Sequence, residues 1–204
     1  MMNPMIASLL LTLALAPQSP KAAPAPSPVS VVFDTELGPI TVRVDLAHAP
    51  ATGANFLKYV DGHFYDGGAV NRSVRPDNTT RHDVEIQVIQ LQSDAARKGE
   101  EFPPIPLERT NVTGLKHVSG ALAMARGQAD SATSSFFISI GDQPELDFGG
   151  KRNADGQGFA VFGQVVSGLD VVKKIHASKT GAKGAYGTES LEPPIRILRA
   201  YRKK

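Results

Sequence analysis

Between residues 29 and 44, side chains alternate with the two-residue period of a half-buried β-strand. One alternating run covers residues 29–34, and a second covers residues 40–44. The segment Glu36-Leu37-Gly38 lies between them and contains the glycine expected in a tight turn. Two short β-branched runs around such a turn predict a β-hairpin.

Further strand-like runs follow, separated by clusters of Gly, Asp and Asn. They cover residues 68–74, 86–91, 120–125, 136–140, 159–165 and 195–201. Pro50 suits the first turn of a helix, and an apolar stripe formed by Ala54, Leu57, Tyr59 and Val60 extends that helix to about residue 61. A second short helix is predicted over residues 169–175.

Many short strands with few helices favour a closed antiparallel barrel, because closure removes exposed strand edges. The predicted fold is therefore mainly β: eight antiparallel strands form the barrel, and two short helices cap it. One domain over residues 29–204 is of a size that buries a substantial core.

Residues 1–28 differ from the rest of the chain. Residues 5–16 form an apolar run that is short for a bilayer span but typical of a signal segment. Residues 18–28 are rich in Pro, Ala and Ser, as in a flexible linker. We expect export to the periplasm or secretion, and an uncleaved N-terminal membrane anchor remains an alternative.

Composition removes several kinds of chemistry. The chain has no cysteine, which excludes disulfides, thiol catalysis and Cys-based zinc sites. No two of its five histidines have the i,i+4 spacing of metal ligands on a helix, so no metal site is expected. The formal net charge is only +2, and no nucleic-acid partner is expected. The glycines between residues 181 and 187 follow no strand and predict a loop.

Six motifs follow one another along the chain. They are Asn55-Phe56-Leu57 with Gly62-His63-Phe64-Tyr65-Asp66-Gly67, Val70-Asn71-Arg72-Ser73-Val74, Val88-Ile89-Gln90, Gly120-Ala121-Leu122-Ala123-Met124-Ala125, Ser134-Ser135-Phe136-Phe137-Ile138, and Leu146-Asp147 with Phe162-Gly163-Gln164-Val165. In this order and at these spacings the chain resembles the cyclophilin family, and its bacterial members in particular. The resemblance covers about residues 29–201.

This resemblance implies an eight-stranded barrel with two capping helices and an outer groove that binds extended X-Pro peptides. It implies a peptidyl-prolyl cis-trans isomerase that needs no metal or organic cofactor. The partners would be proline-containing peptides and unfolded proteins, and we expect a monomer.

The resemblance assigns the catalytic role to Arg72. Rotation about an X-Pro bond makes and breaks no covalent bond, so the enzyme must bind the twisted amide better than either planar form. The prolyl nitrogen regains its lone pair on twisting, and a fixed, permanently charged guanidinium can donate to it.

The same resemblance predicts the substrate-binding residues. Val88, Phe137, Leu146 and Phe159 would form the proline pocket, Gln90 would hold the arginine or the substrate carbonyl, and the backbone of Arg126 would hold the substrate chain; Ala125 and Ser135 complete the predicted set.

The sequence departs from the family pattern around this site. Gln87 replaces an aromatic residue, and Glu145 stands where drug-binding members carry tryptophan. These changes predict a more polar pocket with weaker substrate binding, and they leave open a catalytically weak or inactive peptide-binding or chaperone module. Insertions near residues 75–85 and 149–158 are expected to border the groove and influence specificity.

Overall fold

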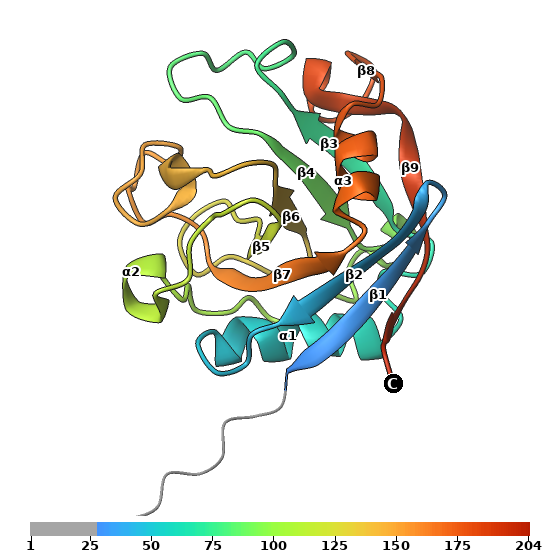
Figure 1. Cartoon of the computed structure of the whole chain (residues 1–204), viewed down its shortest axis with the longest axis vertical. Helices are drawn as coiled ribbons and strands as arrows, with labels where there is room; N and C mark the ends of the chain where they lie inside the picture. The colour runs from blue at the N-terminus through green and yellow to red at the C-terminus, as the bar shows by residue number, and fades with distance from the viewer. Residues whose placement is uncertain (1–27) are drawn as a thin grey trace, which may run out of the picture.

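The structure, a computed structural model, describes residues 28–204 (Figure 1). The apolar run at residues 5–16, on which export was predicted, lies outside the described residues. The strands are β1 (Val29–Thr35), β2 (Gly38–Val44), β3 (Ala69–Val74), β4 (Val88–Gln92), β5 (Ala121–Met124), β6 (Phe136–Ser139), β7 (Val161–Ser167), β8 (Thr180–Gly181) and β9 (Ser190–Arg202). The α-helices are α1 (Pro50–Asp61), α2 (Thr110–Thr113) and α3 (Leu169–His176).

Eight strands form a closed antiparallel barrel. Hydrogen bonding joins them in the order β1-β2-β7-β5-β6-β4-β3-β9, and pairing between β1 and β9 closes the ring. The predicted hairpin is β1–β2, which pairs from Val29 opposite Val44 to Thr35 opposite Gly38. The predicted fold class, a closed eight-stranded antiparallel barrel, is confirmed.

One strand and one α-helix were not predicted. Strand β8 lies outside the ring and pairs with the first residues of β9. That start of β9 was missed because it contains Pro193 and Pro194, which usually argue against a strand. Helix α2 spans only four residues, too few to produce a periodic apolar stripe. The described chain therefore has three short α-helices where two were predicted.

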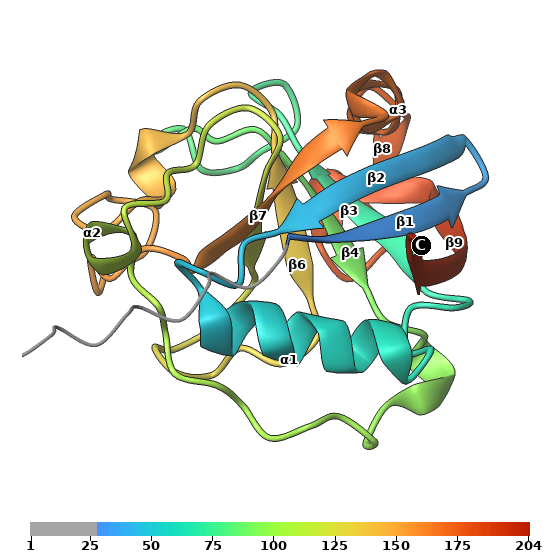
Figure 2. The same cartoon turned by 60° about the horizontal axis from the view of Figure 1, so that its bottom comes forward.

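Helices α1 and α3 pack against the barrel from different sides (Figure 2). Helix α1 buries Phe56, Leu57, Tyr59 and Val60, whereas Ala54, predicted to belong to its apolar stripe, is exposed. Among residues 28–204, no helix has both the length and the apolar character needed to cross a bilayer.

Aromatic side chains fill the barrel interior. Phe56 packs against Phe136 and Phe162, with ring centroids 5.4 and 4.9 Å away. Phe33 and Tyr65 extend this cluster, with their ring centroids 5.5 Å apart. These interlocked rings give the barrel a solid apolar core rather than an internal binding cavity.

Alternation along the strands creates a second, smaller apolar cluster outside the barrel. Phe136 and Ile89 point into the main core, whereas their neighbours Phe137 and Val88 belong to the outer cluster. The outer cluster also contains Leu146, Phe159 and residues from β5. The same alternation that builds the core therefore presents apolar side chains on the outer face of β4, β5 and β6.

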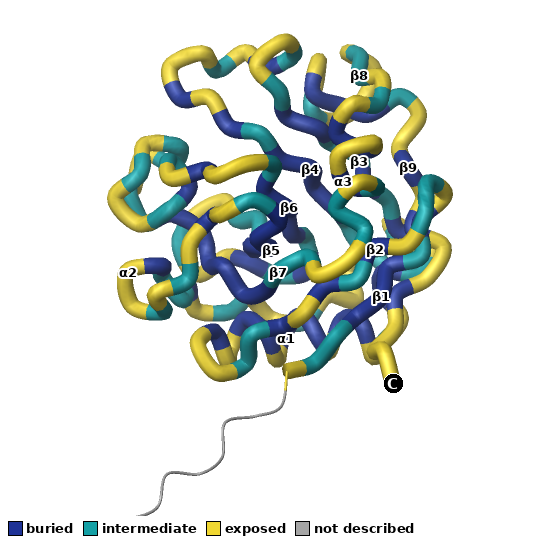
Figure 3. Tube along the Cα trace, viewed as in Figure 1, coloured by how far each residue is buried: buried dark blue, intermediate teal, exposed yellow. Residues whose placement is uncertain are grey.

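The inserted loops, residues 75–85 and 149–158, lie next to this outer face. Most of their residues are exposed or half-buried (Figure 3). A hydrogen bond of 2.8 Å from Arg81 Nη1 to the backbone oxygen of Arg152 joins the two loops. They form a common wall along one side of the outer apolar cluster.

Candidate active site

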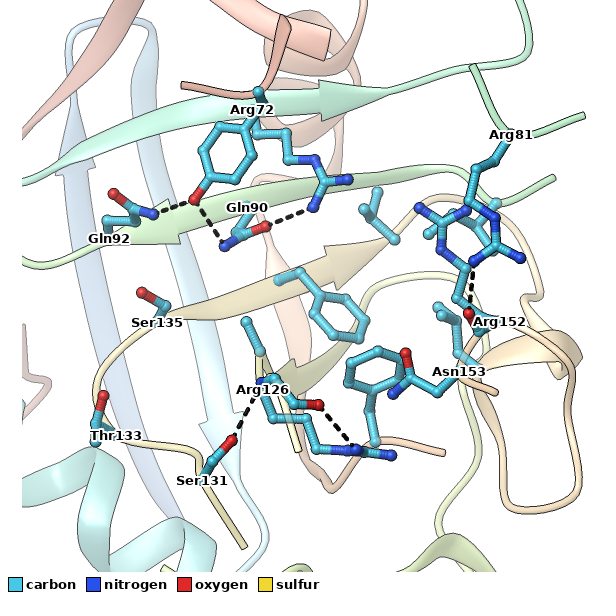
Figure 4. Close-up of a pocket in the computed structure, with 18 residues that line it drawn as sticks. Arg72, Arg81, Gln90, Gln92, Arg126, Ser131, Thr133, Ser135, Arg152 and Asn153 are labelled. Atoms are coloured by element: carbon cyan, nitrogen blue, oxygen red, sulfur yellow. Dashed lines mark hydrogen bonds between the residues drawn. The ribbon is translucent and has the colours of Figure 1, made fainter. Parts of the chain in front are cut away.

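The outer face of β4, β5 and β6 is hollowed into a pocket of about 500 Å³ (Figure 4). All nine predicted site residues line it: Arg72, Val88, Gln90, Ala125, Arg126, Ser135, Phe137, Leu146 and Phe159. Residues separated by up to 87 positions are thus brought to one place, since Arg72 and Phe159 share this pocket. The roles assigned to these residues stay predictions.

The floor of the pocket is apolar. Phe137 and Phe159 meet edge to face, with ring centroids 5.2 Å apart. Val88 and Leu146 complete the floor, and none of the four residues is more than 8 % exposed. A compact apolar surface of this kind suits a proline ring.

His117 supports the floor from behind. Its ring stacks on Phe137 at a centroid distance of 5.8 Å, and its Nδ1 lies 2.8 Å from Asp147 Oδ1. Burial lowers the pKa of His117, which favours the neutral imidazole. A neutral ring oriented by a carboxylate fixes the position of Phe137 without placing a charge under the floor.

Arg72 reaches the pocket from β3. Its Nε and Nη2 donate to Glu189 Oε2 at 2.8 and 2.6 Å, and its Nη1 donates to Gln90 Oε1 at 3.2 Å. A guanidinium carries five N–H groups, so two of those of Arg72 have no acceptor among residues 28–204. One free N–H is on each terminal nitrogen, at the wall of the pocket.

Glu189 and Tyr186 were missed from the sequence. Glu189 ends the 3₁₀ turn η3 (Gly187–Glu189) and lies 117 positions from Arg72 in the chain. The Tyr186 ring lies 4.9 Å from the guanidinium carbon of Arg72, and its hydroxyl accepts hydrogen bonds from Gln90 and Gln92. The sequence predicts only a glycine-containing loop here, and no local pattern indicates an arginine partner.

The Arg126 side chain is occupied with structural contacts. It donates to the backbone oxygens of Gly127 and Gly158 and to both carboxylate oxygens of Asp155. These bonds use all five N–H groups, and the side chain is only 1 % exposed. No hydrogen bond within residues 28–204 uses the backbone N–H or C=O of Arg126, so both groups are free for a substrate chain.

Part of the polar character of the pocket comes from residues that the sequence did not single out, in addition to Ser135 and Gln92. Neither Gln87 nor Glu145 lines it, and the Glu145 carboxylate instead accepts from the backbone N–H of Lys151 at 2.9 Å. Arg81, Arg152 and Asn153 line it and come from the two inserted loops. Both insertions therefore border the pocket and supply its polar wall.

Within residues 28–204, no group of three or more His, Asp or Glu side chains is arranged to hold a metal ion. The described pocket instead combines an apolar floor with hydrogen-bond donors. Such a site can bind a peptide and stabilise charge or a lone pair on it, which requires no nucleophile and no acid–base pair.

Comparisons with known proteins agree with this geometry. The family model described as "Cyclophilin type peptidyl-prolyl cis-trans isomerase/CLD" matches residues 30–202. The chain is 34 % identical to peptidyl-prolyl cis-trans isomerase A of Dickeya dadantii over 191 residues, which are 93 % of each chain. It is 36 % identical to peptidyl-prolyl cis-trans isomerase B of Escherichia coli over 159 residues, 76 % of this chain and 89 % of that protein.

A solved structure has the same fold. It is a cyclophilin-type peptidyl-prolyl cis-trans isomerase of Cryptosporidium parvum, with a TM-score of 0.67 and 17 % sequence identity. The match covers 87 % of this chain and 98 % of the other. A second structure of that protein, determined in the presence of the dipeptide Ala-Pro, matches with a TM-score of 0.66.

Proposed function

This chain belongs to the cyclophilin-type peptidyl-prolyl cis-trans isomerase family and is itself such an enzyme, and we propose that Arg72 drives the rotation while Glu189 and Gln90 hold it in position. The observation that carries this proposal is the state of the Arg72 guanidinium. Three of its N–H groups are fixed by protein acceptors, and two remain free at the edge of the apolar floor.

The barrier to X-Pro rotation comes from amide resonance and amounts to about 20 kcal/mol. A proline ring on Phe137, Leu146 and Phe159 would place its nitrogen near the wall that Arg72 forms. The free N–H groups can donate to the nitrogen lone pair, which exists only in the twisted amide. A hydrogen bond present only in the transition state accelerates rotation, and lowering the barrier by about 4 kcal/mol gives roughly a thousandfold.

Glu189 is a positioning residue in this scheme. Its carboxylate accepts two hydrogen bonds from the arginine, and its side chain is only 10 % exposed. A charge-assisted pair of this kind fixes the plane of the guanidinium before substrate arrives, so little ordering is left for the rotation step. Gln90 fixes the third donor and is 8 % exposed.

The substrate would be an extended proline-containing segment. The free backbone groups of Arg126, at the end of β5, can pair with such a chain in the manner of an added strand. The structural relative determined in the presence of Ala-Pro supports this substrate class. Ser135 and Gln92, which also line the pocket, offer polar contacts to the same chain.

The cellular role we propose is assistance to folding of exported proteins. The apolar run at residues 5–16 and the linker after it support this assignment. Expression of the full chain, cell fractionation and mass spectrometry of the N-terminus would test it. Recovery in the cytoplasm with an intact N-terminus would contradict it.

An isomerisation assay on X-Pro peptides tests the catalytic proposal. The wild type should accelerate cis–trans exchange, and Arg72→Ala should lose most of that acceleration. Arg43→Ala, at an exposed arginine on β2 that does not line this pocket, is the matched control and should retain it. Peptide binding without any acceleration by the wild type would favour the alternative function, a binding or chaperone module.

A further inference from the structure

The pocket carries an excess of positive charge. Arg72, Arg81, Arg126 and Arg152 line it, and no aspartate or glutamate does so among residues 28–204. Three of these arginines form salt bridges with carboxylates that do not line the pocket. The pairs are Arg72–Glu189, Arg81–Asp83 and Arg126–Asp155. Arg152 forms no salt bridge within the described part of the chain.

Arg152 also has unused hydrogen-bond donors. Within residues 28–204, only one of its five N–H groups has an acceptor: Nη1 donates to the backbone oxygen of Val84 at 3.3 Å. The neighbouring Asn153 also lines the pocket, and its Nδ2 is buried with no hydrogen-bond partner in the described part of the chain. Arg152 is half-buried, so its unpaired N–H groups can donate to an acceptor on a bound ligand.

The electrostatics of the wall point in the same direction. Burial, followed by the nearby charges of Arg81 and Arg72, lowers the pKa of Arg152. The positive charge is therefore held in unfavourable surroundings, and a negative group placed beside it would relieve that cost.

Arg152 and Arg72 stand on different sides of the apolar floor. Figure 4 shows Arg72 and Gln90 at one side and Arg81, Arg152 and Asn153 together at the other, and all five line one pocket. A proline ring on the floor would thus lie between Arg72, which is next to the rotating bond, and Arg152, which has no carboxylate partner in the described residues. A side chain beside the proline can reach the Arg152 wall.

We propose that this wall is a specificity site, and that the enzyme prefers X-Pro segments with an acidic side chain next to the proline. Arg152 binds the acidic group, and Arg81 adds to the positive field. This preference rests on the proposed function of the pocket as a peptide isomerase site.

The inserted loops explain why the site exists in this chain. Arg81 comes from one insertion, and Arg152 and Asn153 come from the other. The bonds from Arg81 to the Arg152 backbone and from Arg152 to the Val84 backbone hold the loops together. Substrate selection is thereby separated from the strands that carry Arg72, Val88 and Phe137.

Matched peptides test the proposal. Glutamate, phosphoserine, glutamine and lysine are placed in turn before and after the proline of one short peptide. We expect kcat/KM for glutamate to exceed that for glutamine by about tenfold at one position, the size expected of one charge-assisted hydrogen bond. The phosphoserine peptide distinguishes a site for carboxylates from one for phosphorylated chains, and added salt should weaken the preference.

Variants then assign the preference to the wall. Arg152→Met should bring the glutamate and glutamine peptides to the same kcat/KM, and Arg152→Glu should favour the lysine peptide. Arg81→Met should reduce the preference partially. Arg43→Met, which removes one exposed positive charge outside the pocket, should leave it unchanged. Circular dichroism of each variant verifies folding.

NMR titration measures direct binding of the same peptides. Together with the rate assay, it distinguishes failure of the acidic preference from failure of the isomerase mechanism. Acceleration of all peptides without discrimination between glutamate and glutamine would overturn the specificity site and leave the isomerase mechanism intact. Preferential binding of the glutamate peptide without acceleration would support the site and contradict the catalytic proposal. A preference that survives both Arg152→Met and Arg81→Met would also overturn the assignment.

Discussion

Arg72 and Arg152 occupy two sides of one pocket, and their surroundings differ. Arg72 has three of its five N–H groups fixed by Glu189 and Gln90, whereas Arg152 has one donor engaged and no carboxylate partner within residues 28–204. A paired guanidinium is held in one geometry, as a rotation catalyst requires. An unpaired guanidinium gains most from an incoming anion, as selective binding requires. The same side chain therefore serves catalysis or specificity according to whether its partner belongs to the protein or to the substrate.

Removal of each arginine in turn gives the largest expected effects. Arg72→Met should lower kcat/KM for every X-Pro peptide by roughly a thousandfold, because the donor to the twisted amide is lost. Arg152→Met should lower it only for peptides with an acidic neighbour, by about tenfold. A cis–trans assay on glutamate and glutamine peptides measures both effects. Equal losses of kcat/KM on all peptides for both variants would contradict the assignment of different roles to the two arginines.

Weakening the contact between Glu189 and Arg72 should lower the rate less than removal of Arg72 itself. Glu189→Gln should lower kcat by about tenfold with little change in KM, because a charge-assisted hydrogen bond is weakened while the peptide contacts remain. Asp34→Asn, which weakens the surface pair with Arg199, is the matched control and should leave both constants unchanged. Glu189→Asp keeps the carboxylate and should therefore have a higher kcat than Glu189→Gln. A purely structural role for Glu189 does not predict this difference.

The apolar floor of the pocket lies between Arg72 and Arg152. Its role in substrate binding can be tested by comparing Phe137, which belongs to the floor, with its neighbour Phe136, which points into the barrel. Phe137→Leu should raise KM about fivefold for all peptides, since roughly 1 kcal/mol of apolar contact is lost. Phe136→Leu, one position away but inside the barrel, should lower the free energy of unfolding by about 1 to 2 kcal/mol without changing KM. Steady-state kinetics and urea unfolding of both variants separate the two roles, and a reversed result would place the floor on the wrong face of β6.

Acid should produce the smallest effect, confined to the loop at residues 149–158. Hydrogen bonding to Arg126 lowers the pKa of Asp155 from 3.8 to about 2. Because the folded value lies below the unfolded one, the stabilisation is complete above about pH 4 and is lost as the pH falls through 2. The protection of this loop's amides, measured relative to their intrinsic exchange rate at each pH, should therefore decrease between pH 4 and 2, before the barrel unfolds. Asp155→Asn should remove this change, and an unaltered profile in that variant would contradict the assignment.

The barrel could be predicted from the sequence because its information is local. Alternation identified β1 and β2, short apolar runs between Gly, Asp and Asn clusters identified the other strands of the ring, and Pro50 marked the start of α1. The prediction failed where that information is absent, in the proline-containing start of β9 and in the four-residue helix α2.

The site was predicted only as far as its motifs reach. Motifs on the strands and the segments beside them indicated Arg72, Gln90 and the floor, and the structure brings them together. Glu189, Tyr186 and Arg152 lie in loops with no periodic pattern, and their contacts with the pocket depend on how distant segments pack. The inserted loops were expected to border the groove, but which of their side chains reach it could be seen only in the structure.

Exchange NMR on a saturating, uncharged X-Pro peptide tests the central role of Arg72 most directly, because it measures rotation on the bound peptide separately from binding. With the wild type, cis and trans signals should interconvert rapidly. With Arg72→Ala, the peptide should still shift the signals of the pocket, but its interconversion should return to the uncatalysed time of tens to hundreds of seconds. Rapid interconversion on the bound Arg72→Ala variant would contradict a catalytic role for Arg72, since rotation would then depend on other groups in the pocket.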